Sequence, residues 1–240
     1  MTVSAPKLAS TVLLLRDEPD GGFSVFMVQR SMKSSFMPGA YVFPGGGVEE
    51  SDWSSKMALS DSQLFDRFGS GMDPNAARAH LCAAVREVRE EARVQLTNPS
   101  GMQTFSHWIT PAIESRRFDT WFLVTRMPED AQPTHDDHEV VASRWVEPKS
   151  AVERYGDGEI LLAPPTYYTL WDLARFDSAE EVIEDARGRR VIGVQPRFEQ
   201  VDGHMALLLP GDSLYPSDYP VDGPTRIVMG EGGRWWVVAG

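Results

Sequence analysis

Residues 73–92 constrain the fold of this chain more than any other segment, because their cap, periodicity and length all indicate one helix. Asp73 is a good N-terminal cap, and Pro74 suits the first position of a helix. Apolar residues then recur at helical spacing and form one stripe, which consists of Leu81, Val85, Val88 and Ala92. We therefore predict an amphipathic helix from Pro74 to about Ala92.

Three glutamates share the other side of this predicted helix. Glu87, Glu90 and Glu91 are related by i, i+3 and i, i+4 steps, and repulsion at these spacings destabilises a helix by roughly a few tenths of a kcal/mol per pair. Arg86 and Arg89 can offset part of this repulsion as surface ion pairs. In an arbitrary Glu-rich helix a solvated charged face is the usual explanation, so the cluster alone assigns no function.

The rest of the chain alternates strand-sized apolar runs with turn residues and further helical segments. We predict strands at 10–16, 23–29, 41–43, 103–108, 118–125, 139–146, 191–201, 205–209, 226–229 and 234–238. We predict further helices at 61–68, 148–154, 166–176 and 178–186. The third strand ends at Pro44 and three glycines, where we expect the chain to turn and its backbone to approach a ligand closely. This mixture indicates an α/β fold.

Charge and composition argue against two classes of partner. A chain with a formal net charge of −12 lacks the basic footprint that nucleic acid polymers need, and its apolar runs are too short to span a membrane. Cys82 is the single cysteine and the N-terminal apolar run is too short for a secretory signal, so we expect a cytoplasmic protein. An anionic substrate would need local cations, either metal ions recruited by carboxylates or well-placed arginines.

A glycine segment upstream gives the glutamate cluster a second interpretation. Asp52 stands six residues after Gly46, and Arg86 and Glu87 begin the acidic run. Together these segments resemble the Nudix box, which reads Gly, a carboxylate six residues later, and then Arg-Glu-aliphatic-x-Glu-Glu-x-Gly-aliphatic. The matching residues are Gly46, Asp52, Arg86, Glu87, Val88, Glu90, Glu91 and Val94, preceded by Phe43, Pro44 and Gly45.

Two features depart from this pattern. Residues 53–85 separate Asp52 from Arg86, where the box has about seven residues, so we expect an insertion at about 53–72. Loop-closure entropy grows slowly with length, and such an insertion can form a lid or a substrate wall. Arg93 stands where the box has its last glycine, so either it adopts a left-handed conformation at a cost of ~1 kcal/mol or the helix ends differently.

The resemblance implies an α/β/α sandwich with a mixed sheet, in which a loop and a helix present carboxylates to Mg²⁺ or Mn²⁺. Hard divalent cations prefer oxygen ligands, which suits a glutamate-rich face. The metal ligands implied by motif position are Glu87, Glu90, Glu91 and the carbonyl of Gly46. Arg86 is expected to orient a carboxylate of the box, with Asp52 as its partner.

Glu139 resembles the further carboxylate that Nudix proteins often supply from a later loop, because it lies six residues before Trp145 in a similar strand. It is a candidate metal ligand or general base, and a solvated glutamate at a strand start is the alternative. The implied mechanism uses two or more metal ions that bridge the diphosphate and lower the pKa of a bound water for in-line attack on phosphorus. Glu87 or Glu139 would take the proton, and Glu90 is expected to be needed for turnover.

Residues around the glycines also resemble an extra signature of the coenzyme A diphosphatases. The residues in register with that signature are Arg30, Ser31, Gly39 and 43–46, whereas Val28 and Ser35 depart from it. Residues 116–122 and 162–166, together with the insertion, resemble the peroxisomal-type branch of that family. The implied reaction cleaves coenzyme A or acyl-coenzyme A into 3′,5′-ADP and a phosphopantetheine product.

Three arginines are candidate phosphate ligands in this acidic chain. Arg30, Arg116 and Arg117 lie in the segments that carry the resemblance, and guanidinium groups bind phosphate well. An ordinary surface or strand-edge ion pair is an equally good explanation for each of them. The backbone of Gly45 and Gly46 is a further candidate substrate contact.

The sequence also predicts a domain organisation and leaves two alternative functions open. We expect a Nudix hydrolase domain at 8–160 and a C-terminal α/β extension at 161–240 that packs on the same core, and we consider a homodimer. One alternative is a Nudix hydrolase of another nucleoside-diphosphate-linked substrate, such as ADP-ribose, NADH or a dinucleotide. The other is a catalytically weak Nudix-fold module that binds its ligand. Pocket residues decide between these functions, because the box cleaves any accessible diphosphate.

Overall fold

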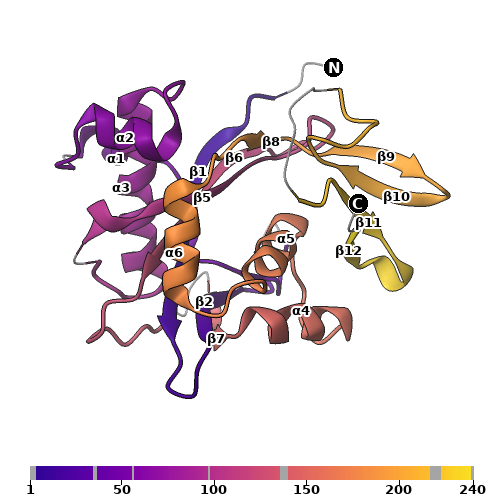
Figure 1. The fold of residues 1–240 in the computed structure, drawn as a ribbon, viewed down its shortest axis with the longest axis horizontal. Helices are drawn as coiled ribbons and strands as arrows, with labels where there is room; N and C mark the ends of the chain where they lie inside the picture. Colours follow the sequence, from indigo (N-terminus) through magenta and orange to yellow (C-terminus); the bar gives the residue numbers. More distant parts are fainter. Residues whose placement is uncertain are drawn as a thin grey trace.

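A mixed β-sheet forms the centre of the computed structural model, which describes residues 4–34, 37–55, 57–96, 98–135, 140–216 and 223–238 (Figure 1). Its strands are β1 (Lys7–Asp17), β2 (Phe23–Arg30), β3 (Tyr41–Val42), β4 (Gly45–Gly47), β5 (Gln103–Ile109), β6 (Phe118–Arg126), β7 (Val140–Val146) and β8 (Gly193–Val194). The order is β3-β2-β1-β6-β5-β8, with β4 paired to β1 and β7 paired to β2. The β1–β6 and β5–β8 pairs are parallel, and the other pairs are antiparallel.

Strand β1 shows why helices cover both faces of this sheet. Its middle is apolar and buried at every position, and successive side chains of a strand point to opposite faces. Val12 and Leu14 belong to one apolar cluster, whereas Leu13 and Leu15 belong to another. A strand that is buried on both sides needs a layer of helices on each face.

Each helical layer comes from a different part of the chain. One face carries α1 (Glu50–Ser54), α2 (Asp61–Phe68) and α3 (Pro74–Glu91), and the other carries α4 (Pro148–Gly156), α5 (Pro164–Leu173) and α6 (Ala179–Gly188), as Figure 1 shows. The predicted α/β/α sandwich with a mixed sheet is therefore confirmed. No helix in the described ranges is long and apolar enough to cross a membrane.

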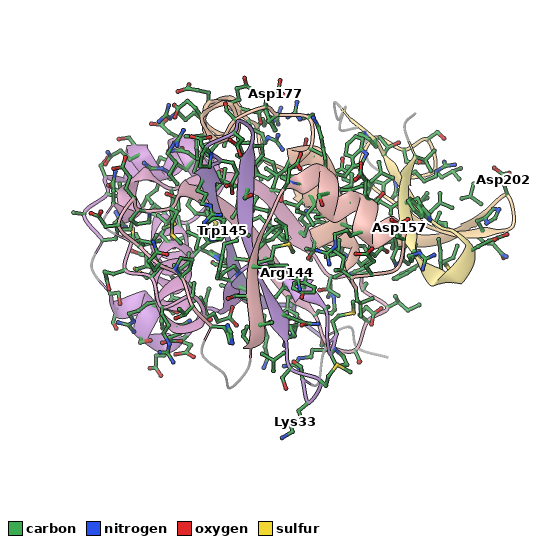
Figure 2. The ribbon with its side chains drawn as sticks, turned by 90° about the horizontal axis from the view of Figure 1, so that it is seen from below. Lys33, Arg144, Trp145, Asp157, Asp177 and Asp202 are labelled. Atoms are coloured by element: carbon green, nitrogen blue, oxygen red, sulfur yellow. The ribbon has the colours of Figure 1, made fainter. Side chains whose placement is uncertain are left out.

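A second, antiparallel sheet follows α6. Its strands are β9 (Arg197–Val201), β10 (His204–Leu208), β11 (Arg226–Met229) and β12 (Trp235–Val238), in the order β12-β11-β10-β9. Leu207, Ile227 and Trp235 of this sheet belong to the same apolar cluster as Leu13 and Leu170. The β9–β10 hairpin projects outward, and Figure 2 shows Asp202 at its outer end.

Two predicted elements differ from the observed ones. The glycines after Pro44 do not form a turn, because Gly45–Gly47 is the strand β4 and pairs with β1. The single strand predicted at 191–201 is divided into β8 and β9, with Pro196 between them. Proline has no N–H to donate to a ladder, so it ends regular pairing there.

The insertion of the box is a folded part of the core. It begins in the last turn of α1 and contains α2, which starts at a capping box in which the Ser60 side chain accepts from the N–H of Gln63. Leu64 and Phe68 of α2 are buried in the cluster that includes Leu81 of α3. The helix predicted at 61–68 is confirmed, while a lid or wall function for the insertion stays a prediction.

Candidate active site

The strand β4 and the helix α3 approach each other so closely that two positions require glycine. A Cβ atom at Gly45 would lie 2.4 Å from the carbonyl oxygen of Ser10. A Cβ atom at Gly46 would lie 2.3 Å from Oε1 of Glu87. Neither glycine has a positive φ, so close approach and not backbone conformation explains them.

A polar residue in the apolar strand β1 fixes the path of the chain into β4. The hydroxyl of Thr11 donates to the carbonyls of Phe43, at 3.1 Å, and Pro44, at 2.9 Å. The N–H of Val12 also donates to the Pro44 carbonyl. The chain thereby crosses from β3, which pairs with β2, to β4, which pairs with β1.

The glutamates of α3 have different environments beside β4. Glu87 and Glu91 are buried, and Oε2 of Glu91 accepts from the N–H of Gly45 at 2.9 Å. The carboxylate of Glu87 lies over Gly46, as the Cβ distance shows. The side chain of Glu90 is half-exposed. The α3–β4 junction therefore combines two buried carboxylates with one that solvent reaches.

Arg86 ties this junction together. Its Nε and Nη2 donate to the two carboxylate oxygens of Asp52 at 3.2 and 3.0 Å, so the pair is bidentate. Nη2 also donates to the carbonyl of Gly47 at 2.7 Å. Nη1 donates to Glu87 at 2.7 Å and to Glu90 at 3.3 Å. The expected partnership of Arg86 with Asp52 is observed, and the same guanidinium also orients two of the glutamates.

Burial and neighbouring charges shift the pKa values at the junction. Burial raises the pKa of Glu87, and the carboxylates of Glu90 and Glu49 add to this effect, while Arg86 partly offsets it. Burial opposes the charged form of Arg86, but its hydrogen bonds to the carboxylates of Asp52 and Glu87, together with their charges, outweigh this effect and raise the pKa of Arg86. The junction thus holds more negative charge than Arg86 alone neutralises.

The residues of the junction fit a hard divalent cation. Their donors are oxygens, from the glutamates of α3 and from the backbone of β4, and Mg²⁺ and Mn²⁺ prefer such ligands. Because residue 46 is a glycine, the space beside the Glu87 carboxylate is not filled by a side chain at this position. Among the residues that the structure describes, no three His, Cys, Asp or Glu side chains form a ready metal cage. Instead, the carboxylates of Glu87 and Glu90 form ion pairs with Arg86.

The predicted phosphate-binding arginines lie in three different environments. Arg117 is buried, and its guanidinium donates to the carbonyls of Thr110, at 3.1 Å, and Ser4, at 2.8 Å. These bonds hold the N-terminal segment against the end of β5. Arg116 is exposed, with its guanidinium carbon 5.6 Å from the ring centroid of Phe118.

Arg30 lies at the end of β2, where its Nη2 donates to the hydroxyl of Ser34 at 2.7 Å. Its backbone pairs with Val140, the first residue of β7. Glu139, the predicted further carboxylate, and Ser35, the departure from the coenzyme A signature, lie outside the described residues.

His80 is a buried polar residue beneath the junction that the sequence interpretation missed. Its Nδ1 lies 3.0 Å from the hydroxyl of Ser10, the residue that pairs with Gly46. Burial lowers the pKa of His80 to about 4, so the ring is neutral at pH 7. A usable signal was its spacing of four and eight residues from Ala84 and Val88, which places it on the buried face of the helix.

Comparisons with known proteins agree with this geometry. The family model described as the NUDT19 Nudix domain matches residues 6–91 and 96–175. The chain is similar to the acyl-coenzyme A diphosphatase NUDT19 of Gallus gallus, with 29% identity over 86% of this chain and 76% of that protein. The Homo sapiens protein of the same name is 28% identical, over 85% and 75% of the two chains. A crystal structure of a NUDIX hydrolase from Alicyclobacillus acidocaldarius superposes with a TM-score of 0.62 at 20% identity, covering 76% of this chain and 97% of that one, which shows the shared fold.

Proposed function

Because the chain belongs to the NUDT19 Nudix domain family, we propose that it hydrolyses the diphosphate linkage of coenzyme A or acyl-coenzyme A with the aid of Mg²⁺ or Mn²⁺. The products are 3′,5′-ADP and a phosphopantetheine or acyl-phosphopantetheine. The relatives named acyl-coenzyme A diphosphatase support this substrate, since they match most of the chain.

The observation that carries the proposal is the set of contacts made by Arg86. A charged helix face in solvent does not need a bidentate arginine that also reaches a glycine carbonyl on a neighbouring strand. Here that arginine holds Asp52, Glu87 and Glu90 beside β4. Such an arrangement presents carboxylate oxygens at a fixed place, which a metal-dependent hydrolase requires.

Glu87, Glu90 and Glu91 would hold the metal ions, together with the carbonyl of Gly46. When bound, such ions neutralise the charge of a diphosphate and lower the pKa of a water molecule. Glu87 or Glu139 accepts the proton of the attacking water. Arg86 acts as a positioning residue, because its donors are engaged by Asp52 and the neighbouring backbone.

Arg30, Arg116 and Arg117 are the proposed phosphate contacts, and the backbone of Gly45 and Gly46 faces the diphosphate. The exposed guanidinium of Arg116 can reach a ligand without breaking a buried contact. Arg117 keeps further N–H donors besides those that bind Thr110 and Ser4, since a guanidinium carries five.

A substrate panel tests the proposal. Coenzyme A, acyl-coenzyme A, NADH, ADP-ribose and diadenosine polyphosphates are each incubated with the protein and Mg²⁺, and the products are identified by mass spectrometry. We expect 3′,5′-ADP and a phosphopantetheine product. Cleavage of ADP-ribose alone would instead favour a nucleoside-diphosphate hydrolase, and cleavage of nothing would favour a ligand-binding module.

Two glutamate variants complete the panel. Glu90→Gln should lose nearly all turnover while its unfolding curve stays unchanged, because the side chain is half-exposed and contributes little to the core. Glu199→Gln, an exposed glutamate in β9, is the matched control and should retain wild-type turnover. Wild-type turnover in Glu90→Gln would refute the assigned metal site.

Location, assembly and domain boundary are lesser parts of the proposal. We retain a cytoplasmic location, which the lone Cys82 supports, since an oxidising compartment usually selects cysteine pairs. A homodimer through the C-terminal sheet is supported by Trp236 and Val238, which are exposed on the edge strand β12. The division at residue 160 follows the start of the segment that leads into α5.

A further inference from the structure

A large hollow lies at the opposite edge of the central sheet from the α3–β4 junction. It is bounded by residues 66–71 at the end of α2, by residues 189–193 before and within β8, and by Pro210 and Tyr215. Its volume is about 650 Å³, within the range of sites that bind small molecules. The insertion of the box and the C-terminal extension each supply one wall.

We propose that this hollow binds a phosphate-bearing small molecule at a site separate from the α3–β4 junction. The sheet register supports the separation. Gly46 pairs with Ser10, and Ser10 pairs with Trp121 on the next strand. Trp121 pairs with His107, which pairs with Gly193 at the wall of the hollow. Four strand spacings therefore separate Gly46 from Gly193, or roughly 19 Å.

The hollow concentrates positive charge in an acidic chain. Arg67, Arg189 and Arg190 line it, whereas Asp66 is the one acidic residue in its described lining. The whole chain has a formal net charge of −12, so this local excess of arginine runs against the overall charge. A cavity lined by one sign of charge concentrates ligands of the opposite sign.

Arg67 is the clearest sign that an anion is needed. Its Nη1 and Nη2 donate to the carbonyls of Gln63 and Ser100, but its Nε is buried and has no hydrogen-bond partner among the described residues. Within the described ranges, no carboxylate forms an ion pair with Arg67. Burial lowers the pKa of Arg67, and the nearby charge of Asp66 offsets only part of this effect. Arg67 as a whole is half-buried, but its Nε is buried, and a bound anion would give this N–H an acceptor and the guanidinium a counter-charge.

The other two arginines have complementary roles. Arg189 is engaged by Asp172 and Asp185, and its guanidinium carbon lies 4.1 Å from the ring centroid of Phe105, so it forms a rigid wall. Arg190 is exposed, and it forms no ion pair within the part of the chain that the structure describes. Arg67 and Arg190 therefore remain as the cations available to a ligand.

The loop after α2 borders this space and is uncrowded there. Gly69 has φ +85°, which explains the glycine, but Gly71 has no positive φ, and a Cβ there would meet no atom of the described residues within 4 Å. Neither conformation nor crowding requires a glycine at Gly71. Guanidinium groups beside this space favour phosphate oxygens over apolar ligands or cations, because they offer charged N–H donors.

Calorimetric titration in EDTA tests the proposal without turnover. EDTA removes metal-dependent binding at the carboxylates of α3, so the outcome is independent of the proposed hydrolase activity. Inorganic pyrophosphate and ADP are the two probes, and they distinguish a phosphate site from a nucleotide site. We expect one-to-one binding of at least one probe to the wild-type protein. Absence of binding by both would overturn the proposal.

Three variants locate the binding. The double variant Arg67→Gln/Arg190→Gln should bind at least about ten-fold more weakly, as expected when two charged hydrogen bonds are lost. Arg187→Gln removes an exposed arginine of α6 that pairs with Glu184 and does not line the hollow, so it should bind like the wild type. Arg190→Gln alone removes an exposed side chain without disturbing the core, and it should still weaken binding by about three-fold.

Unchanged binding in the double variant, or in Arg190→Gln, would overturn the proposal. The double variant should also hydrolyse acyl-coenzyme A with kcat/KM within about two-fold of wild type, because the hollow is far from the junction. A parallel loss of binding and hydrolysis in a folded double variant would show that the hollow belongs to the substrate site, and would overturn its separateness.

Discussion

Two regions of the molecule are held by the same interaction and use it differently. In the α3–β4 junction, Arg86 donates from Nε and Nη2 to the buried carboxylate of Asp52 at 3.2 and 3.0 Å. In the C-terminal extension, Arg226 donates from the same two nitrogens to the buried carboxylate of Asp212 at 2.8 and 2.9 Å. The first pair joins α1 to α3, and the second holds the loop after β10 against β11.

The surroundings of the two arginines differ: one pair is structural, and the other lies in the proposed active site. Arg86 also binds Glu87, Glu90 and the carbonyl of Gly47. Arg226 forms no other ion pair within the described ranges of the chain, and its carboxylate partner accepts instead from the N–H of Leu214, which closes a turn. A bidentate arginine is therefore informative about function only when it orders further polar groups.

The largest expected effect comes from Gly46→Ala. The new Cβ would lie 2.3 Å from Oε1 of Glu87, so the carboxylate or the strand must move. Displacement of the proposed metal ligand Glu87 by about 1 Å should lower kcat/KM for acyl-coenzyme A by between about 100- and 1000-fold. Steady-state kinetics by quantification of 3′,5′-ADP measures this change.

Gly47→Ala is the matched control, because the nearest described atom to a Cβ there is the carbonyl oxygen of Leu8, at 3.9 Å. It should retain activity within about three-fold of wild type. Equal activity of the two variants would show that the close approach of Gly46 to Glu87 is irrelevant to the reaction.

Low pH should affect the stability of the two regions differently, because His80 lies beneath the α3–β4 junction. Burial lowers the pKa of His80 from 6.5 to about 4. The stability contributed by the neutral ring is therefore fully present above pH 6.5, and it is lost progressively as the pH falls from 6.5 through 4. The full loss corresponds to about 3 kcal/mol in the free energy of unfolding. Urea denaturation between pH 7 and 4 measures it, and His80→Asn should flatten this dependence.

The pair in the extension should persist over the same pH range. Hydrogen bonds from Arg226 lower the pKa of Asp212, so its contribution is present above the ordinary pKa of 3.8 and is lost only at lower pH. Asp212→Asn should therefore destabilise the protein equally at pH 7 and pH 5. A steep pH dependence of that difference between pH 7 and 5 would contradict this assignment.

Lysine substitutions compare the two arginines directly. Lysine retains the charge but loses bidentate geometry. Arg86→Lys should lower kcat/KM for acyl-coenzyme A by about 30-fold and also reduce the free energy of unfolding by about 2 kcal/mol. Arg226→Lys should reduce stability by a similar amount and leave kcat/KM unchanged. Loss of activity in both variants at a temperature where both are folded would remove the distinction between the regions.

Features set by local chemistry could be predicted from the sequence. The helix α3 begins at Pro74 with the Asp73 side chain as its cap, as the pattern indicated, because capping and helical periodicity depend on neighbours in the chain. The pairing of Arg86 with Asp52, which joins residues far apart in the chain, was instead expected from the resemblance to the Nudix box.

Features set by long-range contacts could not be predicted. We predicted a turn at Gly45 and Gly46. They are glycines because Ser10 and Glu87 approach them closely, and these residues lie in segments distant along the chain. The contacts of Arg117 could not be predicted either, because two of its donors bind the backbone carbonyls of Thr110 and Ser4, which belong to other segments of the chain, while its role as a phosphate ligand stays a prediction. Residue type alone does not reveal whether a guanidinium already has partners.

The smallest expected effect compares two left-handed residues, one in each region. Arg93, directly after the cap of α3, has φ +56°, and Asp202, in the β9–β10 turn, has φ +51°. A left-handed conformation costs most residues ~1 kcal/mol, whereas a short polar side chain such as that of aspartate tolerates it. Arg93→Gly should therefore raise the free energy of unfolding by ~1 kcal/mol, and Asp202→Gly by less than about half of that. Chemical denaturation measures both. An equal gain in the two variants would mean that conformational strain at the end of α3 is no greater than in an ordinary hairpin turn, so that the missing glycine of the box would carry no penalty in this chain.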